Sequence, residues 1–189
     1  LFYGPALRHV LGRSVMTASP DAMDVLLAFQ ATLAERGIAL VIVPVPSKVS
    51  LYPDRLSGRV RADAVPRNQG YGAWMEAYHA AGGVAFDPTT ALMEARATGS
   101  AYLRRDSHWT PQGVDYSAKA LADLLKERVD FSEDGRRVYR QGESQTVAYP
   151  GDLAAMLYPE SGPGTVAEAV VIAPVEDENG VPWEPEMGS

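Results

Sequence analysis

A continuous apolar run, IALVIV, occupies residues 38–43, and the letters PVP follow it directly at residues 44–46. Most of these six residues are β-branched and none is polar, which is typical of a strand buried on both faces of a parallel sheet. Proline cannot donate to a strand ladder, so the strand is expected to end at residue 43. We therefore predict that residues 38–43 form a central strand with parallel neighbours.

Helical and strand-like segments alternate around this run. The apolar periodicity predicts helices over residues 21–36, 68–81, 90–97 and 111–128, a short strand over 84–86, and a surface excursion over 47–67. Thr110 is placed as N-cap and Pro111 as first residue of the last helix. We expect the side of that helix that carries Ala118, Leu121 and Leu125 to pack on the sheet. The alternation predicts an α/β fold with a mostly parallel sheet flanked by helices.

The C-terminal part of the chain is less regular. Residues 130–165 are rich in turn-forming residues around a helical patch at 153–157, and residues 167–173 resemble a strand. Residues 174–189 form an acidic, proline-rich tail. A chain of 189 residues is the size of one domain. We expect residues 1–189 to be a single, incomplete domain whose remainder follows the tail.

The composition excludes several classes of function. The chain has 17 Lys and Arg against 24 Asp and Glu, a net charge of −7, which argues against binding to nucleic acid. It has no cysteine, so disulfides, thiolate metal sites and a cysteine nucleophile are excluded. The sequence contains neither a glycine-rich phosphate loop nor an apolar stretch of about 18 residues, so we predict no cofactor and no transmembrane segment.

Asp106 and His108 are the main candidates for catalysis. They lie two positions apart, in a loop that follows a strand-like segment and precedes the capped helix at residue 110. Side chains two positions apart in an extended segment point to the same side. A carboxylate at hydrogen-bonding distance from the ring Nδ1 would hold one tautomer, which leaves Nε2 free to take a proton from a hydroxyl nucleophile. An N-cap and a packed ring would give the same pattern.

The region from residue 38 to 125 resembles the second half of an SGNH hydrolase. The block DSHWTPQG at residues 106–113 is similar to the signature of the alginate O-acetyltransferases of the AlgX/AlgJ type. PVPSK at 44–48 before LYPD at 51–54, and GDL at 151–153, are also similar to that family. SGNH enzymes usually have two residues between the Asp and the His, whereas this chain has only Ser107.

The resemblance implies a Ser-His-Asp triad of which this chain carries Asp106 and His108. In the family a Gly-Asp-Ser nucleophile block follows the Asp-x-His block, but Gly151-Asp152 is followed by Leu153, so we interpret it as a structural turn that opens a short helix. We expect the nucleophile beyond Ser189, which leaves residues 1–189 inactive alone. Ser47 is a second candidate hydroxyl, although its setting is more typical of a turn.

Three further interpretations concern the same region. Lys48 is a candidate for binding an acidic sugar carboxylate, although a solvated charge is the simpler interpretation, and Ser47 and Trp109 are candidates for substrate binding beside it. Asp106 and His108 supply too few ligands for a zinc site, so we expect no metal. His9 and His79 are interpreted as packed or surface histidines.

The resemblance implies O-acetylation of an exopolysaccharide, with a polysaccharide acceptor, a membrane-bound acetyl donor protein and a periplasmic location. Two other functions stay open from the residues alone. A carbohydrate esterase or deacetylase would use the same triad with water as acceptor. A polysaccharide-binding or assembly module would need no triad.

Overall fold

The computed structural model describes residues 1–18, 22–128, 138–157 and 167–184. Within these ranges the fold is mostly helical, with three small two-stranded sheets. The elements in chain order are α1 (Gly4–Leu11), α2 (Val15–Ala18), α3 (Ala22–Ala34), β1 (Val41–Ile42), α4 (Lys48–Leu51), α5 (Pro53–Leu56), α6 (Tyr71–Ala80), β2 (Val84–Ala85), α7 (Thr89–Thr98), α8 (Pro111–Arg128), β3 (Tyr139–Gln141), β4 (Gln145–Tyr149), α9 (Asp152–Leu157), β5 (Glu168–Ile172) and β6 (Val175–Asp177).

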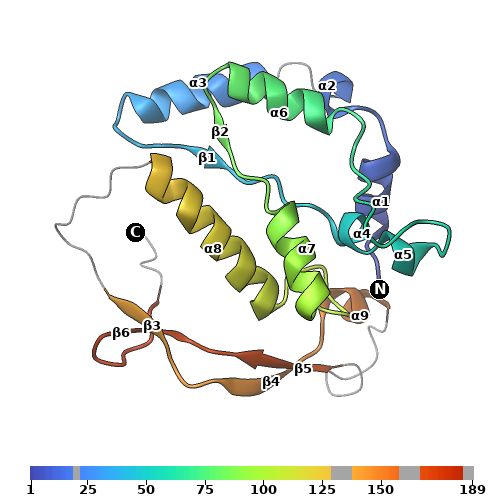
Figure 1. The fold of residues 1–189 in the computed structure, drawn as a ribbon, viewed down its shortest axis with the longest axis vertical. Helices are drawn as coiled ribbons and strands as arrows, with labels where there is room; N and C mark the ends of the chain where they lie inside the picture. The colour runs from blue at the N-terminus through green and yellow to red at the C-terminus, as the bar shows by residue number, and fades with distance from the viewer. Residues whose placement is uncertain (19–21, 129–137, 158–166, 185–189) are drawn as a thin grey trace.

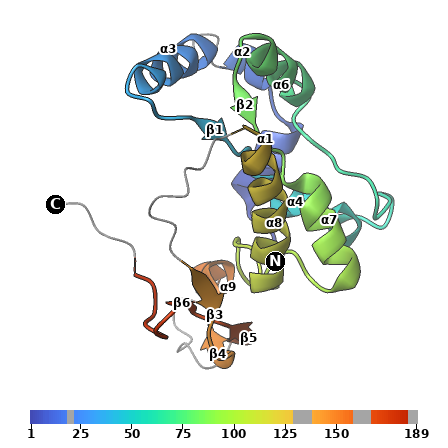
Figure 2. The same ribbon diagram turned by 60° about the vertical axis from the view of Figure 1, so that its left-hand side comes forward.

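The short parallel pair β1–β2 lies between two layers of helices. In both views α3 and α6 lie on one side of the pair, and α7 and α8 lie on the other (Figures 1 and 2). The antiparallel pairs β3–β6 and β4–β5 lie beyond α7 and α8, and the β4–β5 pair extends toward α9 (Figure 1). The described helices do not include one that is long and apolar enough to cross a membrane.

The predicted strand at residues 38–43 is confirmed in place and in parallel pairing, but not in extent or burial. Strand β1 covers only Val41–Ile42, both half-buried, and Ile38 is 50% exposed. A strand is fully buried only when other strands flank both of its edges and other elements cover both of its faces. Within the described ranges β1 pairs with β2 alone, so one edge of β1 has no strand beside it. The predicted mostly parallel sheet is likewise wrong for this chain, because two of the three described sheets are antiparallel.

The longer helices lie where the periodicity placed them. Helices α3, α6, α7 and α8 match the predicted ranges within a few residues, and Thr110 Oγ1 accepts from the Gly113 N–H at 3.0 Å as the expected N-cap. The predicted packing face of α8 is correct only in part. Leu121 and Leu125 are half-buried, but Ala118 is exposed, and the fully buried positions are Gly113 and Ser117. A Cβ at Gly113 would collide with the Ala101 carbonyl oxygen, so this glycine lets α8 approach the preceding segment closely.

The predicted surface excursion at residues 47–67 is wrong at its start. The short helix α4 buries Val49 and Leu51, which are 2% and 0% exposed, and α5 follows it directly. A four-residue helix is too short to show a helical period, so its core positions escape a periodicity analysis. The core cluster around Leu51 comprises Leu51, Leu92, Ala95, Ala101 and Tyr102.

The C-terminal part forms strands where turns were expected. The predicted strand at 167–173 is β5, which pairs with β4 inside the turn-rich region, and the predicted helix at 153–157 is α9. The proline-rich tail contains β6. Parts of residues 130–165, and residues 185–189, lie outside the described residues.

Candidate functional site

The loop that joins α7 to α8 is closed at its base by backbone hydrogen bonds. Tyr102 and Trp109 form a β-bridge, and the Leu103 N–H donates to the His108 carbonyl oxygen at 3.1 Å. The closure fixes both ends of residues 103–108, so the few side chains between them have defined directions. The Asp106 side chain turns inward and is 1% exposed.

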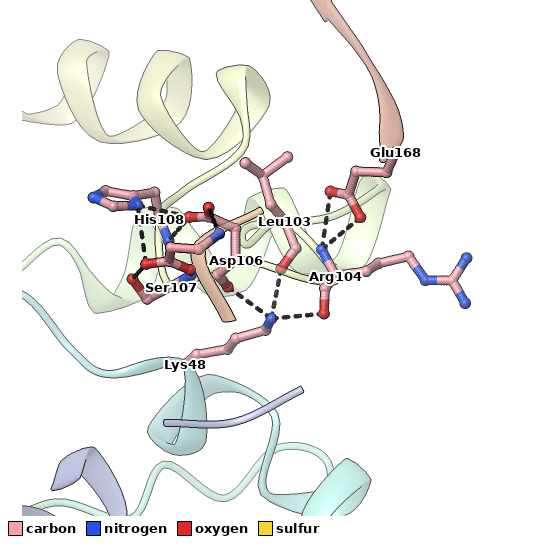
Figure 3. Close-up of polar contacts among 8 residues, drawn as sticks. Lys48, Leu103, Arg104, Asp106, Ser107, His108 and Glu168 are labelled. Carbon is pink, nitrogen blue, oxygen red and sulfur yellow. Dashed lines mark hydrogen bonds and ion pairs between the residues drawn. The ribbon is translucent and has the colours of Figure 1, made fainter. Parts of the chain in front are cut away.

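Three N–H groups surround the Asp106 carboxylate. Oδ1 accepts from the His108 ring Nδ1 at 2.6 Å and from the His108 backbone N–H at 2.7 Å, and Oδ2 accepts from the Asp152 backbone N–H at 2.7 Å. The His108 side chain is 72% exposed. Its second ring nitrogen lies on the side away from Asp106 (Figure 3). The arrangement pairs a buried carboxylate with a ring that is open to solvent.

The hydrogen bonds keep Asp106 charged. Burial by itself raises the pKa of the Asp106 carboxyl, but the N–H donors of Asp152 and His108 outweigh burial and hold that pKa below its ordinary value. An ionised Asp106 can only accept a hydrogen bond, so the 2.6 Å contact assigns the ring proton to Nδ1 and leaves the Nε2 lone pair available. This pair can therefore accept a proton at Nε2 and stabilise the imidazolium that results.

Asp152 belongs to this site, although its sequence context predicted only a turn. The Ser107 N–H donates to Asp152 Oδ1 at 2.7 Å, and the Ser107 hydroxyl donates to Asp152 Oδ2. Asp152 Oδ2 lies 3.8 Å from the His108 Nδ1. Asp152 lies 46 positions after Asp106, so no local pattern could have linked the two.

The turn before α9 fits closely against the same loop. Gly151 has a φ of +79°, and a Cβ added there would lie 2.5 Å from the Arg105 carbonyl oxygen. The Ala154 N–H donates to that same oxygen at 3.1 Å. The expected turn and short helix are therefore present, and they are built against the Asp106 loop.

Lys48 is not the solvated charge that the sequence favoured. Its Nζ donates to the carbonyl oxygens of Leu103, Arg104 and Asp106 at 2.5, 3.1 and 3.0 Å (Figure 3). Burial lowers the pKa of Lys48, and the nearby carboxylates, Glu168 foremost, partly offset that effect. The contacts tie α4 to the loop, and the role of Lys48 in substrate binding stays a prediction.

The other candidate residues have structural partners. Ser47 is the N-cap of α4 and accepts from the Ser50 N–H at 3.4 Å, in agreement with a turn role. Trp109 packs against the core cluster around Leu51. Their roles in substrate binding stay predictions.

A cavity of about 360 Å³ lies at the carboxyl end of β1, and its lining does not include Asp106 or His108. Apolar residues make up much of the lining, and His9, Ser47 and Ser50 are among its polar residues. The other described histidine, His79, has its Nδ1 3.1 Å from the Gly83 carbonyl oxygen. Both histidines are exposed, which agrees with the interpretation of His9 and His79 as packed or surface histidines.

Asp106, His108 and Asp152 have oxygen and nitrogen atoms within 4.8 Å of one another, which raises the question of a metal. Zinc lies about 2.0–2.2 Å from each ligand, and tetrahedral geometry then separates two ligands by about 3.4 Å. The 2.6 Å from Nδ1 to Oδ1 is a hydrogen-bond distance instead. N–H and O–H donors already occupy oxygens of both carboxylates, so the donor set fits hydrogen bonding better than metal binding.

Comparisons with known proteins identify the family. Residues 5–180 match the family described as "SGNH hydrolase-like domain, acetyltransferase AlgX". The chain is 34% identical over 128 residues to the "Probable alginate O-acetylase AlgJ" of Pseudomonas fluorescens, which covers 66% of this chain and 31% of that protein. It is 28% identical over 123 residues to the "Alginate biosynthesis protein AlgX" of Pseudomonas aeruginosa, which covers 64% of this chain and 26% of that protein.

Two solved structures share the fold. The O-acetyltransferase domain of Pseudomonas putida AlgJ superposes with a TM-score of 0.62 at 19% identity, over 94% of this chain and 60% of that one. Pseudomonas aeruginosa AlgX superposes with a TM-score of 0.62 at 22% identity, over 93% of this chain and 40% of that one. The chain spans between about a quarter and a third of the length of these curated relatives. On the family match, the chain belongs to the AlgX family of SGNH hydrolase-like acetyltransferase domains.

Proposed function

We propose that this chain carries the acid–base pair of an O-acetyltransferase that acts on an alginate-like exopolysaccharide. The observation that carries the proposal is the 2.6 Å contact from the buried Asp106 carboxylate to the exposed His108 ring, in a chain of the AlgX family. Asp106 orients the ring through Nδ1, and His108 acts at Nε2 as general base and acid.

The reaction has two transfers of one acetyl group. A serine hydroxyl attacks the carbonyl carbon of the acetyl donor, its proton passes to Nε2, and the donor's leaving group departs with that proton. A sugar hydroxyl then attacks the acetyl-serine, gives its proton to Nε2, and the proton returns to the serine as the sugar ester leaves. In both halves Asp106 stabilises the positive charge on His108.

The nucleophile in this proposal is a serine beyond residue 189. Three serine hydroxyls of the described residues take part in other contacts: Ser107 donates to Asp152, and the hydroxyl oxygens of Ser47 and Ser50 lie 3.0 Å apart. The chain covers only 31% of the length of the Pseudomonas fluorescens relative. Residues 1–189 would then form one part of a larger SGNH-like domain, with the tail at 174–189 leading to the rest.

The acceptor and the donor follow from the family. Relatives named as alginate O-acetylases support a polysaccharide acceptor, and the resemblance supports a membrane-bound acetyl donor protein and a periplasmic location. The net charge of −7 disfavours strong electrostatic capture of a polyanion, so specific contacts would have to hold an alginate-like acceptor.

The test measures acetyl transfer by the complete gene product. With p-nitrophenyl acetate as donor and an alginate oligosaccharide as acceptor, we expect acetylated oligosaccharide by mass spectrometry. His108→Ala should lower the rate by at least about 10⁴-fold while circular dichroism shows a folded protein. Asp123→Asn on the exposed face of α8 is the control.

Two results would replace the proposal. Free acetate with no acetylated sugar would identify an esterase. Oligosaccharide binding with no turnover, unaffected by His108→Ala, would identify a binding module.

A further inference from the structure

The residue between Asp106 and His108 has a defined partner. Ser107 points toward the first residue of α9, where its N–H and its hydroxyl donate to the two oxygens of one carboxylate, that of Asp152. The Asp152 side chain is 31% exposed, so the contact is partly shielded from water. A carboxylate that accepts from both a backbone and a side-chain donor of one residue fixes that residue's position and its rotamer.

The contact is reciprocal. While the Asp152 side chain holds Ser107, the Asp152 backbone N–H donates to Asp106 Oδ2 at 2.7 Å. The neighbouring Ala154 N–H donates to the Arg105 carbonyl oxygen at 3.1 Å. The first turn of α9 therefore contacts Arg105, Asp106 and Ser107, three consecutive residues of the loop.

The short spacing of the Asp-Ser-His block makes this support important. With one residue between them, Asp106 must turn its carboxylate back to reach both the ring and the backbone N–H of His108. Because the three residues are consecutive, a shift of Ser107 would also displace Asp106 and His108. Asp152 Oδ2 also lies 3.8 Å from Nδ1, so the test has to separate an effect of its charge on the ring from an effect of alignment.

We infer that Asp152 is a positioning residue, which holds Ser107 and thereby aligns Asp106 with His108 in the orientation that leaves Nε2 free. The inference rests on the proposed function for its catalytic consequence, but its structural part stands on the hydrogen bonds alone. Asp152 acts through the loop and need not touch the substrate. Its role explains why a hydroxyl residue stands between Asp106 and His108.

The direct test is the tautomer of His108 in folded protein. In ¹⁵N-histidine-labelled protein, with the His108 signals assigned by a His108→Gln variant, we expect the neutral ring to carry its proton on Nδ1. Asp152→Ala should raise the fraction with the proton on Nε2, because Ser107 is released and the contact to Asp106 loosens. Ser107→Ala, which removes only the hydroxyl, should produce a smaller shift in the same direction.

Conservative variants distinguish an effect of Ser107 alignment on the His108 tautomer from an effect of the Asp152 charge and from a loss of folding. Asp152→Asn keeps an oxygen for the Ser107 N–H, and Ser107→Thr keeps the hydroxyl, so both should stay close to the parent tautomer. If Asp152→Asn changes the tautomer as much as Asp152→Ala does, charge rather than alignment is responsible and the inference is wrong. It is also wrong if Asp152→Ala and Ser107→Ala, both folded, leave the tautomer unchanged.

Kinetics in the complete gene product distinguish this inference from the proposed function. Asp152→Ala should lower kcat by about 10–100-fold through misalignment and leave the KM for the acceptor unchanged, with Asp123→Ala as the matched control. If His108→Ala and Asp106→Asn retain full activity, the proposed function fails, while the tautomer measurement still decides the role of Asp152. If those two variants lose activity and Asp152→Ala keeps the parent kcat, only the inference fails.

Discussion

The loop between α7 and α8 and the turn before α9 both bring a carboxylate to one site, but they do so differently. Asp106 is 1% exposed and contacts the histidine ring directly, whereas Asp152 is 31% exposed and holds Ser107. The first carboxylate is placed by its own loop, and the second by a helix from the C-terminal part of the chain. A site of this kind depends on long-range packing even when its reacting groups are sequence neighbours.

The largest effect is expected in a test of whether the two carboxylates and His108 are enough for turnover without further residues. Purified residues 1–189 contain both, yet we expect no turnover of p-nitrophenyl acetate above background. Loss of the nucleophile from a serine triad costs about 10⁶-fold in kcat. Turnover that Ser47→Ala abolishes would show instead that the nucleophile lies within this chain.

The next test compares the carboxylates one at a time in the complete gene product. Asp106→Asn should lower kcat by about 10⁴-fold, because an amide can donate to Nδ1 and favours the wrong tautomer. Asp152→Asn should lower it far less, since an oxygen for the Ser107 N–H remains. Equal losses in the two variants would mean that both carboxylates act on the ring, which contradicts the division of roles.

The comparison also shows what the sequence could predict. Asp106 and His108 can be recognised as candidates because they form a local pattern with the N-cap Thr110 and with Pro111, all within residues 106–111. Asp152 was interpreted as a turn, which is correct for its backbone, but a contact across 46 positions leaves no trace in local periodicity.

The same limit applies to the sheet and to Lys48. The apolar run at residues 38–43 predicted a parallel strand in the right place, but how many neighbours flank a strand depends on the whole fold, and β1 is only Val41–Ile42. A lysine is usually solvated, yet three carbonyl oxygens of a distant loop surround Lys48. The extent of β1 and the contacts of Lys48 both depend on residues that are remote in sequence.

Lys48 provides a third, smaller test, because it holds the Asp106 loop from the side of α4. Lys48→Met keeps much of the stem but removes the donor for three carbonyl oxygens, so we expect the free energy of unfolding to fall by about 1–3 kcal/mol. Lys48→Arg should not restore it, because a planar guanidinium differs in shape from an ammonium group. Urea unfolding measures the change. An unchanged stability with a higher KM for the acceptor would support the substrate-binding prediction instead.

The smallest expected effect concerns the stability of the fold at low pH. The N–H donors around Asp106 outweigh burial and hold its pKa below the ordinary value of 3.8. A carboxyl whose pKa is lower in the folded state adds stability above its unfolded pKa, and that stability is lost as pH falls through the folded pKa. Asp106→Asn should therefore be less stable than the parent at pH 7, with a gap in urea midpoint that narrows below about pH 4. Thr110→Ala removes hydrogen bonds to the Ser100 carbonyl oxygen and the Gly113 N–H, neither of which titrates, so it is the control for acid effects elsewhere. A gap for Asp106→Asn that stays constant down to pH 3 would contradict the lowered pKa, and with it the view that backbone N–H groups keep this carboxylate charged.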